Sequence, residues 1–231
     1  MKLRLSKCKW SKLLVGAALV AALVVLAGGH AQASNMGFKM NKVIDPKATN
    51  PGVGQNLVAI PYRNPYMTAE DLCAALGLTA SQAKVIQNIA QTGASLSHTC
   101  SNASPFSLRP REGFLVNNQP TTTGGILVGS HQANPPGSVT LYPSATNPGV
   151  GVNFYDLPYH TTNLTAEDVC NDLGLPANSK VIRNVAATGA SLSFLCGGGS
   201  PFTLVLGEAL KVTSISGGLA ITPAAGHPAH F

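Results

Sequence analysis

Ala48-Thr-Asn-Pro-Gly-Val-Gly54 recurs without change as Ala145-Thr-Asn-Pro-Gly-Val-Gly151, and this duplication decides how the chain is organised. The similarity continues downstream, because residues 48–116 align with residues 145–212 with one single-residue gap and 37 identities over 69 positions. A repeat of about one hundred residues is too long for a solenoid unit and has the size of a small domain. The sequence therefore predicts two tandem domains.

Residues 1–33 have the three parts of a secretory signal peptide. Five basic residues precede an unbroken apolar stretch, Leu13–Ala27, and Ala31-Gln-Ala33 supplies a small-residue cleavage site. The apolar stretch is shorter than the roughly 20 residues that a membrane-spanning helix needs. We therefore expect cleavage before Ser34, with an uncleaved anchor as the alternative, and a secreted, periplasmic or cell-surface location.

The signal peptide and the duplication together set the expected domain boundaries. The first repeat module spans residues 34–131, a linker spans 132–138, and the second repeat module spans 139–231. The linker contains two consecutive prolines and is too short for a long tether. The two copies are therefore expected to touch.

The charge of the chain lies mostly in the signal peptide. Five of the 15 Lys and Arg residues belong to it, so the mature chain has ten basic residues against nine acidic ones. No basic stripe is left to neutralise phosphates, which argues against a nucleic-acid partner.

The cysteines agree with export. After cleavage four remain, two at matching positions in each copy. Four cysteines allow three pairings; if each copy closes its own bridge, the pairs are Cys73–Cys100 and Cys170–Cys196. The rival interpretation, a four-cysteine metal site, would need CxxC-like pairs that the chain lacks.

Each copy is expected to be mainly β with one short helix. Thr68 and Thr165 are predicted N-caps, with Asp71 and Asp168 completing a capping box. The rest of each copy consists of short apolar runs separated by Gly and Pro turns, typical of strands. We expect two tandem β-sandwich or partly open barrel domains.

Several short motifs resemble a repeat module of exported prokaryotic cell-surface and secreted proteins. The stretches that carry the resemblance are Asn56-Leu-Val-Ala-Ile-Pro-Tyr62, the helix at Ala69-Glu-Asp-Leu72, the Thr-Gly hairpin, Glu112-Gly-Phe-Leu-Val116 and Leu127-Val-Gly129. The second copy departs from the pattern at Gly207-Glu-Ala-Leu-Lys-Val212. The resemblance implies a surface or periplasmic β-rich module, and it supplies no catalytic residues.

The chain shows no pattern typical of an enzyme. Ser95 and Ser191 lack the last glycine of a nucleophile elbow and lie in a predicted hairpin. The neighbouring acids Glu70 and Asp71 are explained by helix capping. We expect no catalytic residue, cofactor or metal; a weak site at His227 and His230 is the alternative.

Two function classes follow. The first is a non-catalytic structural or adhesive protein, associating with itself through strand edges or with other cell-envelope components. The alternative is an extracellular module that binds carbohydrate or another ligand. Its candidate groove consists of the tyrosines near the Pro-Tyr turns, which are Tyr62, Tyr66, Tyr155 and Tyr159. Burial in or beside the core is the competing interpretation for Tyr62 and Tyr159.

Residues 34–44 precede the repeated region, and Met36, Phe38 and Met40 stand at alternate positions ahead of Val43 and Ile44. This segment is expected to form a strand. It would complete the sheet of its own module or, in a polymer, the exposed edge of a neighbouring subunit.

Overall fold

The structure is a computed structural model that describes residues 37–60, 64–78, 82–109, 112–117, 119–130, 139–157, 163–213 and 219–221. Across these residues the chain is mainly β, as predicted, with one short helix in each repeat. The predicted signal peptide and linker lie outside the described residues.

The same order of elements occurs twice. The first repeat contributes β1 (Gly37–Ile44), β2 (Asn56–Val58), α2 (Ala69–Ala75), β3 (Lys84–Ile89), β4 (Ala94–Thr99), β5 (Phe114–Asn117) and β6 (Thr123–Ser130). The second contributes β7 (Val139–Leu141), β8 (Val152–Asp156), α3 (Ala166–Asp172), β9 (Lys180–Val185), β10 (Ala190–Leu195), β11 (Ala209–Thr213) and β12 (Leu219–Ile221).

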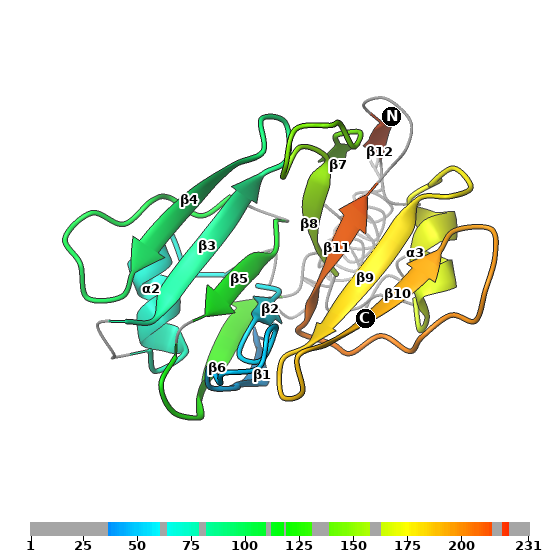
Figure 1. Ribbon diagram of the computed structural model, residues 1–231. Helices are drawn as coiled ribbons and strands as arrows, with labels where there is room; N and C mark the ends of the chain where they lie inside the picture. The colour runs from blue at the N-terminus through cyan, green and yellow to red at the C-terminus, as the bar shows by residue number, and fades with distance from the viewer. Residues whose placement is uncertain are drawn as a thin grey trace, which may run out of the picture. The chain divides into compact units, whose positions relative to one another are not determined.

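Each repeat builds a four-stranded antiparallel sheet with the same strand order. The first sheet runs β2-β5-β3-β4, and the second, written in the opposite direction, runs β10-β9-β11-β8. A barrel requires the first and last strands to pair, whereas these described sheets are open. The barrel alternative is therefore wrong for them. Figure 1 shows both sheets, with α2 behind β3 and α3 behind β9 and β10.

A second, two-stranded sheet accompanies each four-stranded one. β1 pairs with β6 over eight residues, from Gly37 opposite Ser130 to Ile44 opposite Thr123, and β7 pairs with β12 in the second repeat. The described part of the segment before the repeated region is thus a strand that pairs within its own module. The proposed role of this segment in a polymer stays a prediction.

Both helices begin with the predicted capping box. The Thr68 hydroxyl accepts a hydrogen bond from the Asp71 amide, and the Asp71 carboxylate accepts one from the Thr68 amide at 2.8 Å. Thr165 and Asp168 repeat the arrangement. The hydrogen bond from the Thr68 amide is the main reason why the pKa of Asp71 is lowered. These bonds satisfy amides that the first helical turn leaves without partners.

Each repeat has a hydrophobic core of its own, and a third cluster joins the two. The first core packs Leu72, Val85 and Phe114 among others, and the second packs Leu173 and Val181 among others. The third cluster contains residues from both repeats: Leu57, Ala59, Leu115, Phe154 and Ala209.

The repeats also dock on each other through two reciprocal loop contacts. The Gly54 amide in the Pro-Gly loop of the first repeat donates to the Ala186 carbonyl at 2.9 Å. The equivalent Gly151 amide of the second repeat donates to the Ala90 carbonyl at 2.8 Å. The expected contact between the copies is thus present, and each copy gives the other the same pair of surfaces.

Between these two loop contacts, equivalent positions of the two copies meet each other. Gly113 and Ala209 correspond in the duplication, and a Cβ atom added to Gly113 would lie 2.3 Å from the Ala209 Cβ atom. An equivalent pair in contact is what an approximate twofold axis produces. Gly113 therefore has to be glycine for the strands to approach this closely.

Candidate functional site: a histidine–carboxylate pair beside a disulfide

The candidate site lies in the first repeat, between α2 and β4. Glu70 and Cys73 are three residues apart on α2, so their side chains share one face of the helix. His98 lies near the end of β4 and Cys100 directly follows that strand, so they are two residues apart and point to the same side of the sheet. Packing the helix against this strand brings all four side chains together.

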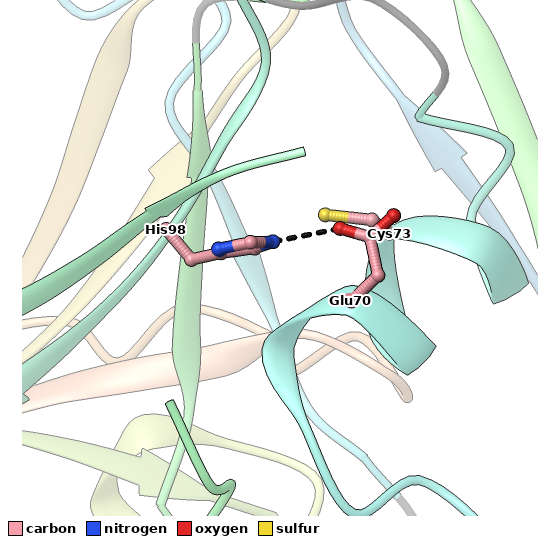
Figure 2. Close-up of side chains that lie close together, drawn as sticks. All are labelled: Glu70, Cys73 and His98. Atoms are coloured by element: carbon pink, nitrogen blue, oxygen red, sulfur yellow. Dashed lines mark hydrogen bonds and ion pairs between the residues drawn. The ribbon is translucent and has the colours of Figure 1, made fainter. Parts of the chain in front are cut away.

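The imidazole and the carboxylate form a short hydrogen bond, which Figure 2 shows with the Cys73 side chain beside it. The His98 Nε2 atom lies 2.7 Å from the Glu70 Oε2 atom, and the His98 side chain is 1% exposed whereas that of Glu70 is 42% exposed. A carboxylate only accepts hydrogen bonds, so Nε2 carries the proton. The Ser101 amide donates to the same Oε2 atom at 3.0 Å.

These hydrogen bonds favour the ionised form of the carboxyl group. The hydrogen bond from His98 is the largest cause of the lowered pKa of Glu70, and the hydrogen bond from the Ser101 amide acts in the same direction. The pair therefore satisfies a buried imidazole with a charged partner that reaches the solvent.

Both predicted disulfides are present. Cys73 pairs with Cys100 and Cys170 with Cys196, with Cα atoms 5.8 Å and 5.7 Å apart. Each bridge joins the buried face of a helix to the end of the hairpin. In this oxidised state the sulfur atoms beside His98 are bonded to each other.

Among the described residues, Glu70, Cys73 and His98 form the one group of at least three His, Cys, Asp and Glu side chains that could hold a metal ion. One donor atom from each lies within 4.8 Å of the others. The second repeat keeps Glu167 and both cysteines but has the buried Phe194 where the first has His98. The constellation is therefore particular to the first repeat.

Of the four predicted tyrosines the structure describes Tyr66 and Tyr155, and it places them with different cores. Tyr155 is 1% exposed in the core of the second repeat, so its ring offers no face for stacking. Tyr66 packs against the core of the first repeat, and its hydroxyl accepts a hydrogen bond from the Val128 amide of β6 at 2.8 Å. Tyr62 and Tyr159 lie outside the described residues.

The sequence did not predict the contact between Glu70 and His98. Asp71 caps α2 as expected, but its neighbour Glu70 turns away to His98. The sequence does carry one indication of this site, because each cysteine of the bridge has a possible metal ligand close by in the chain. Glu70 precedes Cys73 in the pattern Glu-x-x-Cys, and His98 precedes Cys100 in the pattern His-x-Cys. Neither pattern is a CxxC pair, and the donors come from two different elements.

A separate hollow of about 750 Å³ lies beside the end of β4. Its lining is partly polar and includes Lys47, Thr49, Gln82, Lys84 and Thr99. Two amines in one open hollow can attract an anionic group.

Comparison of the chain with known protein families, with curated proteins and with solved structures returned no match. Neither described helix is long and apolar enough to cross a bilayer.

Proposed function

We propose that this chain is an exported, non-catalytic structural protein that associates with further copies of itself through the edges of its sheets. The observation that carries the proposal is the position of β4 and β10, each of which ends a four-stranded sheet. The outer side of such a strand presents backbone amides and carbonyls to which another strand can add.

The sequences of these two strands support the proposal. Soluble proteins normally protect a sheet edge with lysine, other charges or proline. β4 reads Ala-Ser-Leu-Ser-His-Thr and β10 reads Ala-Ser-Leu-Ser-Phe-Leu, with no Lys, Arg, Asp, Glu or Pro. On β10, Leu192 and Leu195 are 37% and 39% exposed. A second copy would cover these side chains while completing the ladder.

The remaining parts of the proposal come from the sequence. The basic and apolar start of the chain is typical of a secretory signal peptide, and disulfides form in oxidising, extracytoplasmic compartments. We further propose that the chain belongs to a class of exported surface modules. It would consist of two tandem domains, at residues 34–131 and 139–231, and each domain would be a β-sandwich.

Size-exclusion chromatography with light scattering tests the proposal on the oxidised mature chain. Wild-type protein should form multimers whose mass rises with concentration, and Leu192→Lys should lower that mass, because a lysine on the edge opposes strand addition. Leu164→Lys is the matched control, since Leu164 is 69% exposed and lies outside any strand. A strict monomer at high concentration, or equal effects of both substitutions, would show that the proposal is wrong.

A ligand-binding module is the second candidate, and the hollow beside β4 favours it. Lys47 and Lys84 would attract an acidic saccharide or a similar anion, and the second repeat has Ser144 at the position of Lys47. Under this candidate the wild-type chain is a monomer whose melting temperature rises with an acidic oligosaccharide. A Lys47→Ala, Lys84→Ala double variant should lose that rise.

A further inference from the structure

We propose that the first repeat binds a thiolate-seeking divalent cation such as Zn²⁺ when its disulfide is reduced, through Cys73, Cys100, His98 and Glu70. The site would be closed while the bridge is oxidised and available when it is open. This inference is independent of the proposed assembly function.

The donor types fit such an ion. Zn²⁺ is held by four ligands drawn from cysteine sulfur, histidine nitrogen and carboxylate oxygen, at about 2.0–2.3 Å. Reduction turns the two sulfur atoms of the bridge into two thiols beside an imidazole and a carboxylate. The resulting Cys₂HisGlu set is complete without a ligand from elsewhere in the chain.

The distances require only small side-chain movements. Ligand atoms at the corners of a tetrahedron around Zn²⁺ lie about 3.3–3.8 Å from one another. The His98 Nε2 and Glu70 Oε2 atoms are 2.7 Å apart, so this pair has to separate by about 0.6 Å or slightly more, and reduction frees the two sulfur atoms to move apart. The Cα atoms of the cysteines, 5.8 Å apart, already stand close enough for both thiolates to face one ion.

Three of the four donors are buried, and the fourth is partly exposed to solvent. The Cys73, Cys100 and His98 residues are 1%, 0% and 2% exposed. The Glu70 carboxylate is the partly exposed member, so it is the donor that an incoming ion meets first.

The chemistry balances with a dithiol or phosphine as reductant. The disulfide accepts two electrons and two protons and becomes two thiols. A dithiol supplies both and is oxidised to its own disulfide, whereas a phosphine supplies the electrons, takes the oxygen of a water molecule to become its oxide, and leaves the two protons of that water for the thiols. The cation then displaces both thiol protons. The neutral imidazole shifts its proton from Nε2 to Nδ1, so that the Nε2 lone pair can bind the ion.

The second repeat is an internal control. It has Glu167, Cys170 and Cys196 at the equivalent positions, but Phe194 replaces the histidine. A reduced second repeat offers three donors and a hydrophobic ring. We therefore expect selective binding by the first repeat.

The test uses the full mature chain, reduced with a phosphine under anaerobic conditions, and Co²⁺ as the probe. Tetrahedral thiolate-bound Co²⁺ has characteristic visible and near-ultraviolet absorption. About one Co²⁺ should bind per reduced chain, Zn²⁺ should displace it, and the oxidised chain should show no such spectrum. His98→Phe should weaken binding more than about 100-fold, since even outer-shell changes cost 10–100-fold. Phe194→His should add a second site.

Two controls separate ligation from folding. Melting of the oxidised His98→Phe variant shows whether it folds, and Cys170→Ser with Cys196→Ser removes the thiols of the second repeat while leaving the proposed site intact. The proposal is overturned if reduced wild-type protein binds no Co²⁺, if a folded His98→Phe variant binds as tightly as the wild type, or if the Cys170→Ser, Cys196→Ser variant loses the site.

Discussion

Asp156 and its counterpart Ala59 show how the two copies diverge at the level of single residues. Asp156 is fully buried at the contact between the repeats, where its Oδ2 atom accepts a hydrogen bond from the Ile60 amide at 3.2 Å. Burial is the main cause of the pKa of Asp156 lying well above its usual value. The folded protein therefore holds this carboxyl group in its neutral form over a range where the unfolded chain ionises it.

This difference predicts a pH dependence with a definite sign. The unfolded chain loses the proton of Asp156 above about pH 4, while the folded chain keeps it. The group thus lowers stability as the pH rises from about 4 towards its folded pKa, by up to about 1.4 kcal/mol per pH unit. Asp156→Asn should raise the free energy of unfolding at pH 7 and change it little at pH 3. Chemical denaturation at both pH values checks this, and an equal change at both would contradict it.

Asp71 and Asp168 affect the pH dependence of stability in the opposite direction, because backbone hydrogen bonds lower the pKa values of both carboxyl groups. Their contribution to stability is present above the unfolded pKa and is lost as the pH falls through the lower folded pKa. Acid titration of a double variant, Asp71→Asn with Asp168→Asn, should show a shallower loss of stability below about pH 4 than the wild type. An unchanged acid limb would contradict this explanation.

At the level of elements, the two helices depend on their caps, because each is only seven residues long and too short to be stable alone. Thr68→Ala and Thr165→Ala should each destabilise the protein by about 1 kcal/mol, as N-cap removal does elsewhere. Denaturant unfolding measures both. Thr121→Ala, at an exposed bend outside the helices and strands, is a control that should cost less. Very different costs for the two caps would mean that α2 and α3 are not equivalent.

Local sequence patterns were sufficient to predict the helices, the hairpins and the disulfides. The capping boxes are encoded within four residues, and the pairing of Cys73 with Cys100 follows from each repeat closing its own bridge. The strand order β2-β5-β3-β4 was not predicted, since β5 inserts beside strands that lie far from it in the sequence. The barrel expectation failed for this reason, as it rested on strand number without the pairings.

The candidate site was missed because it depends on packing between elements. Nothing local to Glu70 distinguishes a capping acid from one that reaches β4, and nothing local to His98 shows which face of β4 it occupies. The tyrosines show the opposite case, in which residues expected to meet lie apart. Their proximity to similar turns suggested a shared surface, but the fold places Tyr155 inside one core and Tyr66 beside the other.

For the whole molecule, the reciprocal loop contacts predict a position at which a single added methyl group destabilises the protein. Gly189 has φ +76°, and a Cβ atom there would lie 2.5 Å from the Pro51 carbonyl oxygen of the other repeat. Gly174 has φ +56° with nothing within 4 Å of its added Cβ atom. Gly174→Ala should therefore cost about 1 kcal/mol from backbone strain alone, and Gly189→Ala about 2 kcal/mol or more. Equal costs in denaturant unfolding would mean that the contact between repeats contributes nothing.

The same contacts predict that the copies stay together without a covalent link. No described disulfide joins the repeats, whereas hydrogen bonds and the shared apolar cluster do. A protease site inserted in the predicted linker 132–138 should, after cleavage, leave two fragments that elute together. Fragments that separate without denaturant would show that the linker holds the repeats together. The uncleaved variant is the control for the insertion itself.

The exchange of equivalent surfaces across Gly113 and Ala209 also bears on the history of the gene. Each copy carries both the loop that docks and the turn that receives it, so a single ancestral unit already had what it needed to pair with its twin. Joining two such units in one reading frame would have required no new contact, only a connection. Once joined, the halves were inherited together, and each was free to acquire differences such as His98 against Phe194 without losing its partner.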